Sequence, residues 1–280
     1  MFDACVIGHV TRDIVRIGSQ KKEMPGGTAY YTSMAMKSLG MNVAVITKVA
    51  KEDKALLGDL ERKQIPIYLR ASPRTTTFTN ISAGDLDSRE QLVGDIALPF
   101  TVADVEDVDS KLFHLGPLTS GDIPIEVLQS ISKRSMISLD VHGFIRSIDK
   151  DSGRVTMTEW KGKEKFLRYV RVLKTDENEA RIISGEENLE EMAVKLSSYG
   201  PEEVIITFSS KGSLIYCKSK FYRIPSFMPK NHVDPTGCGD TYLAGYLYQR
   251  AQGIDITKAG EFAARTASLK LENYGPLGLR

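Results

Sequence analysis

The chain has 280 residues, of which 41% are hydrophobic and 26% are charged, a balance that is ordinary for a soluble globular protein. Its 37 Lys and Arg residues nearly match its 36 Asp and Glu residues, which excludes a general basic surface for nucleic acid or an anionic membrane. The three cysteines, Cys5, Cys217 and Cys238, are scattered and form no CxxC pair, so we expect neither a disulfide framework nor a zinc site.

The chain begins with the pattern of a buried strand rather than that of a signal peptide. Residues 4–7 are apolar and lead to Gly8, with no basic segment before them and no long apolar run. No apolar run elsewhere approaches the length that is needed to span a membrane. We therefore expect a cytoplasmic protein that binds neither membrane nor nucleic acid.

Strand-like and helix-like segments alternate in the first 70 residues. We expect strands at 4–7, 42–49 and 65–69, a helix that opens near 24–31 and runs to about residue 39, and a second helix at 53–63. A βαβαβ alternation is typical of a parallel sheet with helices on its faces.

Two segments, at about 12–25 and 75–95, interrupt this alternation. The first contains a loosely alternating strand, and the second contains two β-rich runs around a turn at 83–87. Because no low-complexity linker separates them from the rest, we expect one domain over 1–280, with these strands forming a small lid sheet outside the main core. Open strand edges in such a lid favour a homodimer that forms through it.

The alternation resumes after residue 110. We expect strands at 111–115, 135–141, 170–174 and 204–208, a hairpin of 212–217 and 221–224, and helices at 123–132, from 175, and at 189–198, 237–251 and 257–271. Residues 145–165 are polar and give no clear pattern. The predicted fold is α/β, a three-layer sandwich with a mostly parallel central sheet flanked by helices, plus the small β-sheet lid.

The most informative segment is 234–240, Asp-Pro-Thr-Gly-Cys-Gly-Asp, which leads directly into an apolar helix. Gly237 and Gly239 allow another group to approach the backbone closely. The first amides of a helix have no internal partner, and the helix dipole favours anions there. The segment therefore predicts an anion site with the Asp240 carboxylate beside it, which suits phosphoryl chemistry. The alternative is an ordinary helix start with an acid in its first turn.

This segment and a second motif, Gly26-Gly27 at the start of an early helix, occur in the order and at the separation typical of ribokinase-like (PfkB-type) kinases. The chain resembles this family over essentially its whole length. The resemblance implies transfer of the γ-phosphoryl group of ATP, with Mg²⁺, to a hydroxyl of a sugar, polyol or nucleoside. The Tyr30-Tyr31 pair and the run at 140–146 resemble members that act on myo-inositol, so we favour an acceptor of that kind.

The resemblance also implies roles for single residues. Asp240 would be the base that accepts the alcohol proton, and the amides of Gly237, Cys238 and Gly239 would hold the charge that develops on the transferred group. A cysteine stands at 238 where the family usually has alanine. A thiol at a helix start tends toward thiolate, so we expect Cys238 to be sensitive to oxidants and alkylating agents, or else to be a small packed residue.

On the acceptor side, Asp13 resembles the family's early aspartate, which binds sugar hydroxyls. Gly26 and Gly27 match the family's glycine pair, where absent side chains let the substrate lie against a helix start. The chain departs from the usual sugar-kinase pattern just after this pair. Thr28 and the residues that follow it lack the asparagine that ribokinase-type members carry there.

On the donor side, the resemblance implies that Thr207 and Gly212 line the ATP phosphates or ribose and that Asn273 approaches the adenine. Asp176 and Glu179 fall on the family's Asn-x-x-Glu element. Their spacing places both on one helix face, where oxygen ligands suit hydrated Mg²⁺. Capping of the helix start by these two acids is the alternative.

Three other functions stay open at this point. A nucleoside kinase differs from the favoured reading only in its acceptor. A cysteine hydrolase would use Cys238 with His232 and an acid, but it would leave Asp240 and both glycines of the motif unexplained. A ligand-binding protein with the kinase fold would have no activity, and the intact Asp240 argues against it.

Overall fold

The computed structural model describes residues 1–17, 20–82 and 89–278. A nine-stranded sheet lies at its centre, in the spatial order β15-β14-β13-β12-β9-β8-β1-β4-β5, and the run from β13 to β5 is parallel. The strands are β1 (Phe2–Ile7), β4 (Val43–Val49), β5 (Ile67–Ala71), β8 (Ser110–Leu115), β9 (Met136–Asp140), β12 (Val172–Asp176), β13 (Glu203–Thr207), β14 (Ser213–Cys217) and β15 (Lys220–Ile224). The mostly parallel sheet of the sequence prediction is confirmed.

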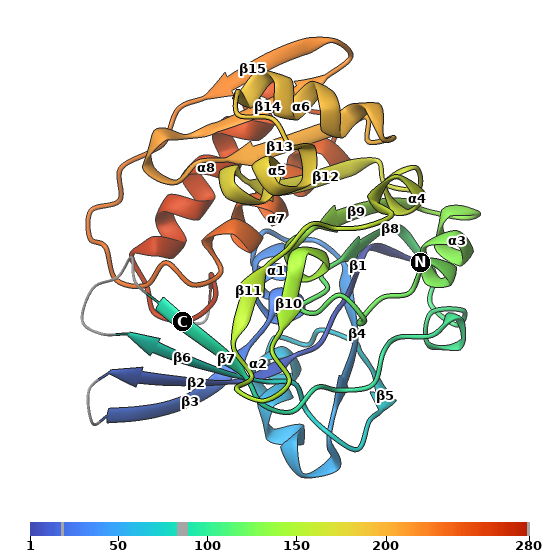
Figure 1. Cartoon of the computed structure of the whole chain (residues 1–280), viewed down its shortest axis with the longest axis vertical. Coiled ribbons are helices and arrows are strands. Elements are labelled where there is room, and N and C mark those ends of the chain that lie inside the picture. Colours follow the sequence, from blue (N-terminus) through green and yellow to red (C-terminus); the bar gives the residue numbers. More distant parts are fainter. Residues whose placement is uncertain (18–19, 83–88, 279–280) are drawn as a thin grey trace.

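Helices cover both faces of this sheet (Figure 1). They are α1 (Thr28–Ser38), α2 (Gly58–Arg62), α3 (Ile125–Ser132), α4 (Lys163–Leu167), α5 (Glu177–Ser184), α6 (Leu189–Ser198), α7 (Cys238–Ala251) and α8 (Ile256–Leu271). In β1, Ala4 and Val6 pack with α1, α7 and α8, whereas Cys5 and Ile7 pack with α3, α5 and α6. Because successive side chains of a strand point to opposite faces, a strand that is covered on both sides is apolar throughout. The three-layer sandwich is confirmed.

A second, four-stranded sheet lies to one side of the first (Figure 1). It consists of β2 (Thr11–Ile17), β3 (Gln20–Gly26), β6 (Thr77–Ser82) and β7 (Arg89–Val93), in the order β3-β2-β6-β7. Its pairs are antiparallel except for β2 with β6. This is the small sheet that the sequence predicts from 12–25 and 75–95; the turn expected at 83–87 lies outside the described residues.

Two segments differ from the sequence prediction or add to it. The helix expected at 53–63 begins as a 3₁₀ helix, η1 (Lys51–Leu57), and becomes α-helical only in α2; its buried apolar side chains are Leu57 and Leu60. The polar segment after 145 forms a hairpin of β10 (Arg146–Ile148) and β11 (Val155–Met157). A bridge between Leu92 and Arg154 joins this hairpin to β7.

In the part of the chain that the structure describes, no helix combines the length and apolar character required to cross a bilayer.

Candidate active site

The carboxyl ends of the parallel strands meet where the chain reverses its direction across the sheet. From β1 the chain first builds β4 and β5 on one side, and it later builds β8, β9 and β12 on the other. Ligands of open α/β sheets bind at such a switch point. Here Gly8 and Gly116, which follow β1 and β8, are so close that a side chain on Gly8 would lie 2.7 Å from the Gly116 carbonyl oxygen, and one on Gly116 would overlap Thr28.

Asp240 lies beside this point, in the first turn of α7. The hydroxyl of Thr32 on α1 donates to Asp240 Oδ1 at 3.5 Å, and Thr28 on the same helix also donates to this carboxylate. Burial and the negative charge of Asp140 raise the pKa of Asp240 to about 7, against the opposing effects of Lys174 and the two threonines. Asp240 is therefore a carboxyl group that titrates near neutral pH, which is the range expected for a general base.

The backbone before Asp240 has some, but not all, of the free amide groups that the predicted anion site requires. Gly237 is left-handed, with φ of 77°, and a side chain there would overlap the ring of Tyr31. The amides of Gly237 and Gly239 have no acceptor among the described residues. The amide of Cys238, by contrast, donates to the Pro235 carbonyl oxygen at 3.2 Å. Two of the three predicted amides are thus available to an anion in this structure, and that of Cys238 is used in a turn.

The thiol of Cys238 does not have the character that the sequence suggests. Its Sγ lies 3.8 Å from the Ala267 carbonyl oxygen, and burial raises its pKa to about 11. The raised pKa disfavours the thiolate and favours the alternative of a small packed residue, because desolvation outweighs the nearby charge of Lys270. His232 is exposed, and no contact between it and Cys238 is found among the described residues. The hydrolase alternative therefore has no activated nucleophile.

A buried lysine lies beneath the anion site. Lys174, on β12, donates to Asp140 Oδ2 on β9 at 2.9 Å, and both side chains are almost fully buried. A side chain at Gly239 would lie 2.9 Å from Lys174 Nζ, so a larger residue there would push the ammonium group away from this position. The ammonium group holds the pKa of Asp140 below its usual range although burial alone would raise it. Lys174 thus supplies positive charge directly below the amides.

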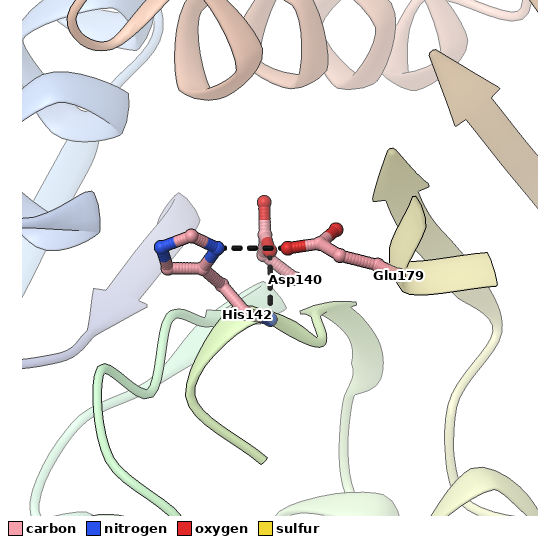
Figure 2. Close-up of side chains that lie close together, drawn as sticks. All are labelled: Asp140, His142 and Glu179. Carbon is pink, nitrogen blue, oxygen red and sulfur yellow. Dashed lines mark hydrogen bonds and ion pairs between the residues drawn. The ribbon is translucent and has the colours of Figure 1, made fainter. Parts of the chain in front are cut away.

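Asp140, His142 and Glu179 point toward one another (Figure 2), and their ligand atoms lie within 4.8 Å of each other. Arg146 donates to Nε2 of His142, so the proton on Nδ1 is the one donated to Glu179 Oε1, at 2.7 Å. The amide of His142 donates to Asp140 Oδ1 at 3.1 Å. The side chains that converge here come from β9, from the turn after it and from α5.

Asp176 and Glu179 form a reciprocal cap at the start of α5. The Glu179 amide donates to Asp176 Oδ1 at 2.8 Å, and the Asp176 amide donates to Glu179 Oε2 at 2.7 Å. The capping alternative of the sequence analysis is therefore present. Burial and the charge of Glu179 raise the pKa of Asp176. Burial alone would also raise the pKa of Glu179, but the hydrogen bond from His142 and the charge of Lys174 hold it below its usual value.

Asp13, Gly26 and Gly27 are neighbours at the base of the small sheet. The hydroxyl of Thr11 donates to Asp13 Oδ1 at 2.6 Å. A side chain on Gly26 would overlap the Asp13 carboxylate, and one on Gly27 would overlap the His9 carbonyl oxygen. Next to both glycines, groups of the protein itself thus fill the space in which the sequence predicts a substrate.

The expected nucleotide residues lie on two separate segments. Thr207 pairs with Asp176 in the register of β12 and β13, and its hydroxyl donates to the Thr175 carbonyl oxygen at 3.3 Å. Gly212 has φ of 103°, and a side chain there would overlap the Ile224 carbonyl oxygen. Asn273 follows α8, and its side-chain amide donates to the Leu269 carbonyl oxygen at 3.0 Å.

Five residues that the fold brings to this site have no assigned role in the sequence prediction: Lys174, Asp140, His142, Thr28 and Thr32. Lys174 is two residues from the carboxyl end of β12 and directly follows the apolar residues Val172 and Leu173, so a lysine next to a buried strand segment is a signal that was available in the sequence. The two threonines gave no such signal. Tyr30, from the tyrosine pair, belongs to the core, where its hydroxyl donates to Asp59.

Comparisons with known proteins agree with a site for phosphoryl transfer. The family model described as pfkB family carbohydrate kinase matches residues 1–278. A cytidine kinase from Thermococcus kodakarensis is 26% identical over 98% of both chains, and an inositol 3-kinase from Arabidopsis thaliana is 23% identical over 96% of this chain and 74% of its own.

Among solved structures, a pyrophosphate-dependent kinase of the ribokinase family, in complex with a pyrophosphate analog and myo-inositol, superposes with a TM-score of 0.90 at 27% identity. The match covers 99% of this chain and 97% of the other. The chain therefore belongs to the pfkB family of carbohydrate kinases and is a phosphotransferase that acts on an alcohol group of a small molecule.

Proposed function

We propose that this kinase transfers the γ-phosphoryl group of ATP to a hydroxyl of a cyclic polyol of the myo-inositol type, with Asp240 as the general base. The observation that carries this proposal is the position and the pKa of Asp240. A carboxyl group with a pKa of about 7 lies at the switch point of the sheet, next to two amides that face no acceptor among the described residues. A base and an anion site in one place suit attack by an alcohol on a phosphoryl group.

The residues around Asp240 support a division of roles. Asp240 accepts the proton of the attacking hydroxyl, and Thr28 and Thr32 hold its carboxylate in place. The amides of Gly237 and Gly239 stabilise the charge on the phosphoryl oxygens, and Lys174 adds positive charge below them. Phosphoryl transfer requires mainly this kind of positioning and charge stabilisation. The amide of Cys238 would join them only after releasing Pro235.

An acceptor rich in hydroxyls is supported by two fixed polar groups. Asp13 is oriented by Thr11 and by the absence of a side chain at Gly26. Arg146 donates to the Leu118 carbonyl oxygen at 3.2 Å and lies over the ring of Phe78, which is part of the small sheet. Charged groups form the strongest hydrogen bonds to hydroxyls, and a carboxylate and a guanidinium offer an acceptor and a set of donors. The names of the plant relative and of the solved neighbour agree with this choice.

On the donor side, we assign the phosphates of ATP to the segment near Thr207 and Gly212, and the base to the segment near Asn273. The register pairs Thr207 with Asp176, so Thr207 lies next to the carboxylate cluster, which consists of Asp140, Asp176, Glu179 and Asp240. Pyrophosphate is the competing donor, because the solved neighbour is pyrophosphate-dependent. A nucleoside is the competing acceptor, because another relative is a cytidine kinase.

The carboxylate cluster fits a hydrated Mg²⁺ ion. Among the described residues that meet here, the carboxylates of Asp140, Asp176, Glu179 and Asp240 outnumber the cations of Lys174 and Arg146. Mg²⁺ is bound in proteins through a few carboxylates and retained waters. We propose that Asp176 and Glu179 hold it while they also cap α5. When bound, the ion would neutralise charge on the donor phosphates.

A matrix of donors and acceptors tests the proposal. The purified chain is incubated with Mg²⁺ and either ATP or pyrophosphate, against myo-inositol, other polyols, sugars and nucleosides, and products are identified by ³¹P NMR. We expect the highest kcat/KM for ATP with a cyclic polyol. Faster turnover of cytidine than of any polyol would mean that the acceptor is a nucleoside. Transfer from pyrophosphate but not from ATP would mean that the donor is pyrophosphate. Failure of every pair would favour the non-catalytic binding protein.

A further inference from the structure

Lys270 is a fully buried lysine outside the catalytic cluster. It lies in the last turn of α8, and its side chain has no accessible surface. The ammonium group donates to the Asp234 carbonyl oxygen at 2.7 Å and to the Asn273 carbonyl oxygen at 3.3 Å, and Asp234 Oδ2 lies 3.2 Å away. It is thus surrounded by two carbonyl oxygens and a carboxylate.

The two oxygens of Asp234 belong to the segment that leads to the anion site. Asp234 Oδ1 accepts the amide of Thr236 at 2.9 Å, and Asp234 Oδ2 accepts the amide of Gly275 at 3.3 Å. The amide of Asp234 in turn donates to the Leu271 carbonyl oxygen at 3.3 Å. The loop before Gly237 is therefore fixed to the end of α8, and Lys270 is the charge at the centre of this junction.

A purely structural role is the plain alternative. A lysine in the last turn of a helix complements the helix dipole, and a buried ion pair can join two elements without any part in the reaction. Two observations go further than this. The ligand set, made of carbonyl and carboxylate oxygens, is the set that binds a small monovalent cation as well as an ammonium group. The positive charge of Lys270 is also felt at Cys238, where it lowers the thiol pKa against the larger effect of burial.

We propose that Lys270 is a positioning residue whose ammonium group acts as a tethered cation, fixing the Asp234 turn and thereby the amides of Gly237 and Gly239, so that phosphoryl transfer requires no free monovalent cation. This inference rests on the proposed role of those amides. It predicts that the oxygen cage left by a shorter or neutral side chain at 270 attracts a cation from solution. Potassium and ammonium ions match the charge and the oxygen preference of the lost group.

The test compares Lys270→Ala, which removes the whole side chain and leaves the cage empty, with the wild type in potassium, ammonium and tetramethylammonium chloride at equal ionic strength. The last cation is too large for the cage. Wild-type kcat should be the same in all three salts. Because misplaced amides stabilise the transferred group poorly, K270A should lose at least about tenfold in kcat in tetramethylammonium and regain much of it in potassium or ammonium. Lys258→Ala is the matched control, since Lys258 is an exposed lysine of the same helix, and it should behave as wild type.

Stimulation of the wild type by potassium would overturn the proposal, and so would unchanged kcat in K270A or a loss that no cation reverses. The melting temperature of K270A provides a readout without turnover, and it should rise in potassium relative to tetramethylammonium. If K270A does not fold in any salt, Lys270→Ser, which also empties the cage and keeps a small polar group, is measured in the same way against the same outcomes. If the variant shows the melting shift but the wild type has no kinase activity, the proposed function is wrong and the cation cage still stands.

Discussion

At the scale of single residues, the chemistry of this protein depends on how burial changes ordinary side chains. Asp240 and Cys238 both lie in the first turn of α7, where a helix dipole favours negative charge. Burial dominates in both cases and raises both pKa values, to about 7 for the carboxyl group and to about 11 for the thiol. The same environment thus gives Asp240 a pKa near neutral pH and keeps the Cys238 thiol protonated at that pH.

Asp240→Asn removes the proposed base while keeping the size of the side chain. Because general base catalysis contributes about 10²- to 10⁴-fold, we expect kcat to fall by that amount while the donor still binds. Steady-state kinetics measure the first effect, and calorimetric titration with the donor measures the second. Asp255→Asn, at the N-cap of α8, is the matched control and should leave both unchanged. Wild-type kcat in D240N would contradict the assignment.

The activity should also rise with pH through the pKa of Asp240. Only the ionised carboxylate accepts a proton, so kcat/KM should increase across an apparent pKa of about 7. The charged groups that act on Asp240 are Asp140, which raises this pKa, and Lys174, which lowers it. Thr32 donates a hydrogen bond that favours the ionised form, so Thr32→Val should move the inflection to higher pH. A pH profile that is flat between pH 5 and 9 would mean that Asp240 titrates near the ordinary carboxyl pKa of about 4, and it would contradict the raised pKa.

At the scale of elements, the small sheet and α1 share a junction that positions the acceptor side. β3 ends at Gly26, α1 starts after Gly27, and the Asp13 carboxylate of β2 occupies the space that a side chain at 26 would need. Packing within the protein therefore explains why both positions are glycine, whether or not a substrate binds there. It lets a strand carboxylate and the His9 carbonyl approach the start of a helix.

Gly26→Ala tests this junction. The added methyl group would overlap the Asp13 carboxylate and displace it, and a misplacement of about 1 Å in a positioning group costs on the order of 10²-fold in rate. We expect kcat/KM for the acceptor to fall by that order, with little change in donor affinity. Gly58→Ala, in a helix where a side chain meets open space, is the matched control. An unchanged kcat/KM in G26A would show that Asp13 does not bind the acceptor.

At the scale of the whole molecule, the site exists because parallel strands end at one edge. β1, β8, β9 and β12 deliver their following residues to the same place, while α1 and α7 approach it from one face and α5 from the other. The small sheet is attached beside this edge through β2 and β3 (Figure 1). One of its edge strands, β7, contacts the β10–β11 hairpin, whereas β3 has β2 as its only strand partner among the described residues.

The edge of β3 leads to a prediction about assembly. Backbone groups along an unpaired edge strand favour pairing with another strand, and a second copy of this chain presents the same edge. We expect a homodimer that forms through the small sheet and dissociates on dilution. Sedimentation velocity over a range of concentrations measures this directly. A single monomeric species at every concentration would contradict it.

Much of the fold could be predicted because it is encoded locally. The alternation of apolar strands with helices gave the layered architecture, and the β-rich runs at 12–25 and 75–95 gave the second sheet. The weaker predictions were those without a local signal. The 3₁₀ start of the helix at 51–57 depends on which apolar side chains the core accepts, and the β10–β11 hairpin depends on its bridge to β7.

The sequence by itself determined the element order, the position of the Asp-Pro-Thr-Gly-Cys-Gly-Asp motif at a helix start, and the family to which these features point, because each depends on residues that are close along the chain. Only the tertiary structure decided the raised pKa values of Asp240 and Cys238, the pairing of Lys174 with Asp140, and the cage around Lys270. Burial and long-range charge depend on which distant segments pack together, as in the separation of 34 positions between Lys174 and Asp140 and of 36 positions between Lys270 and Asp234.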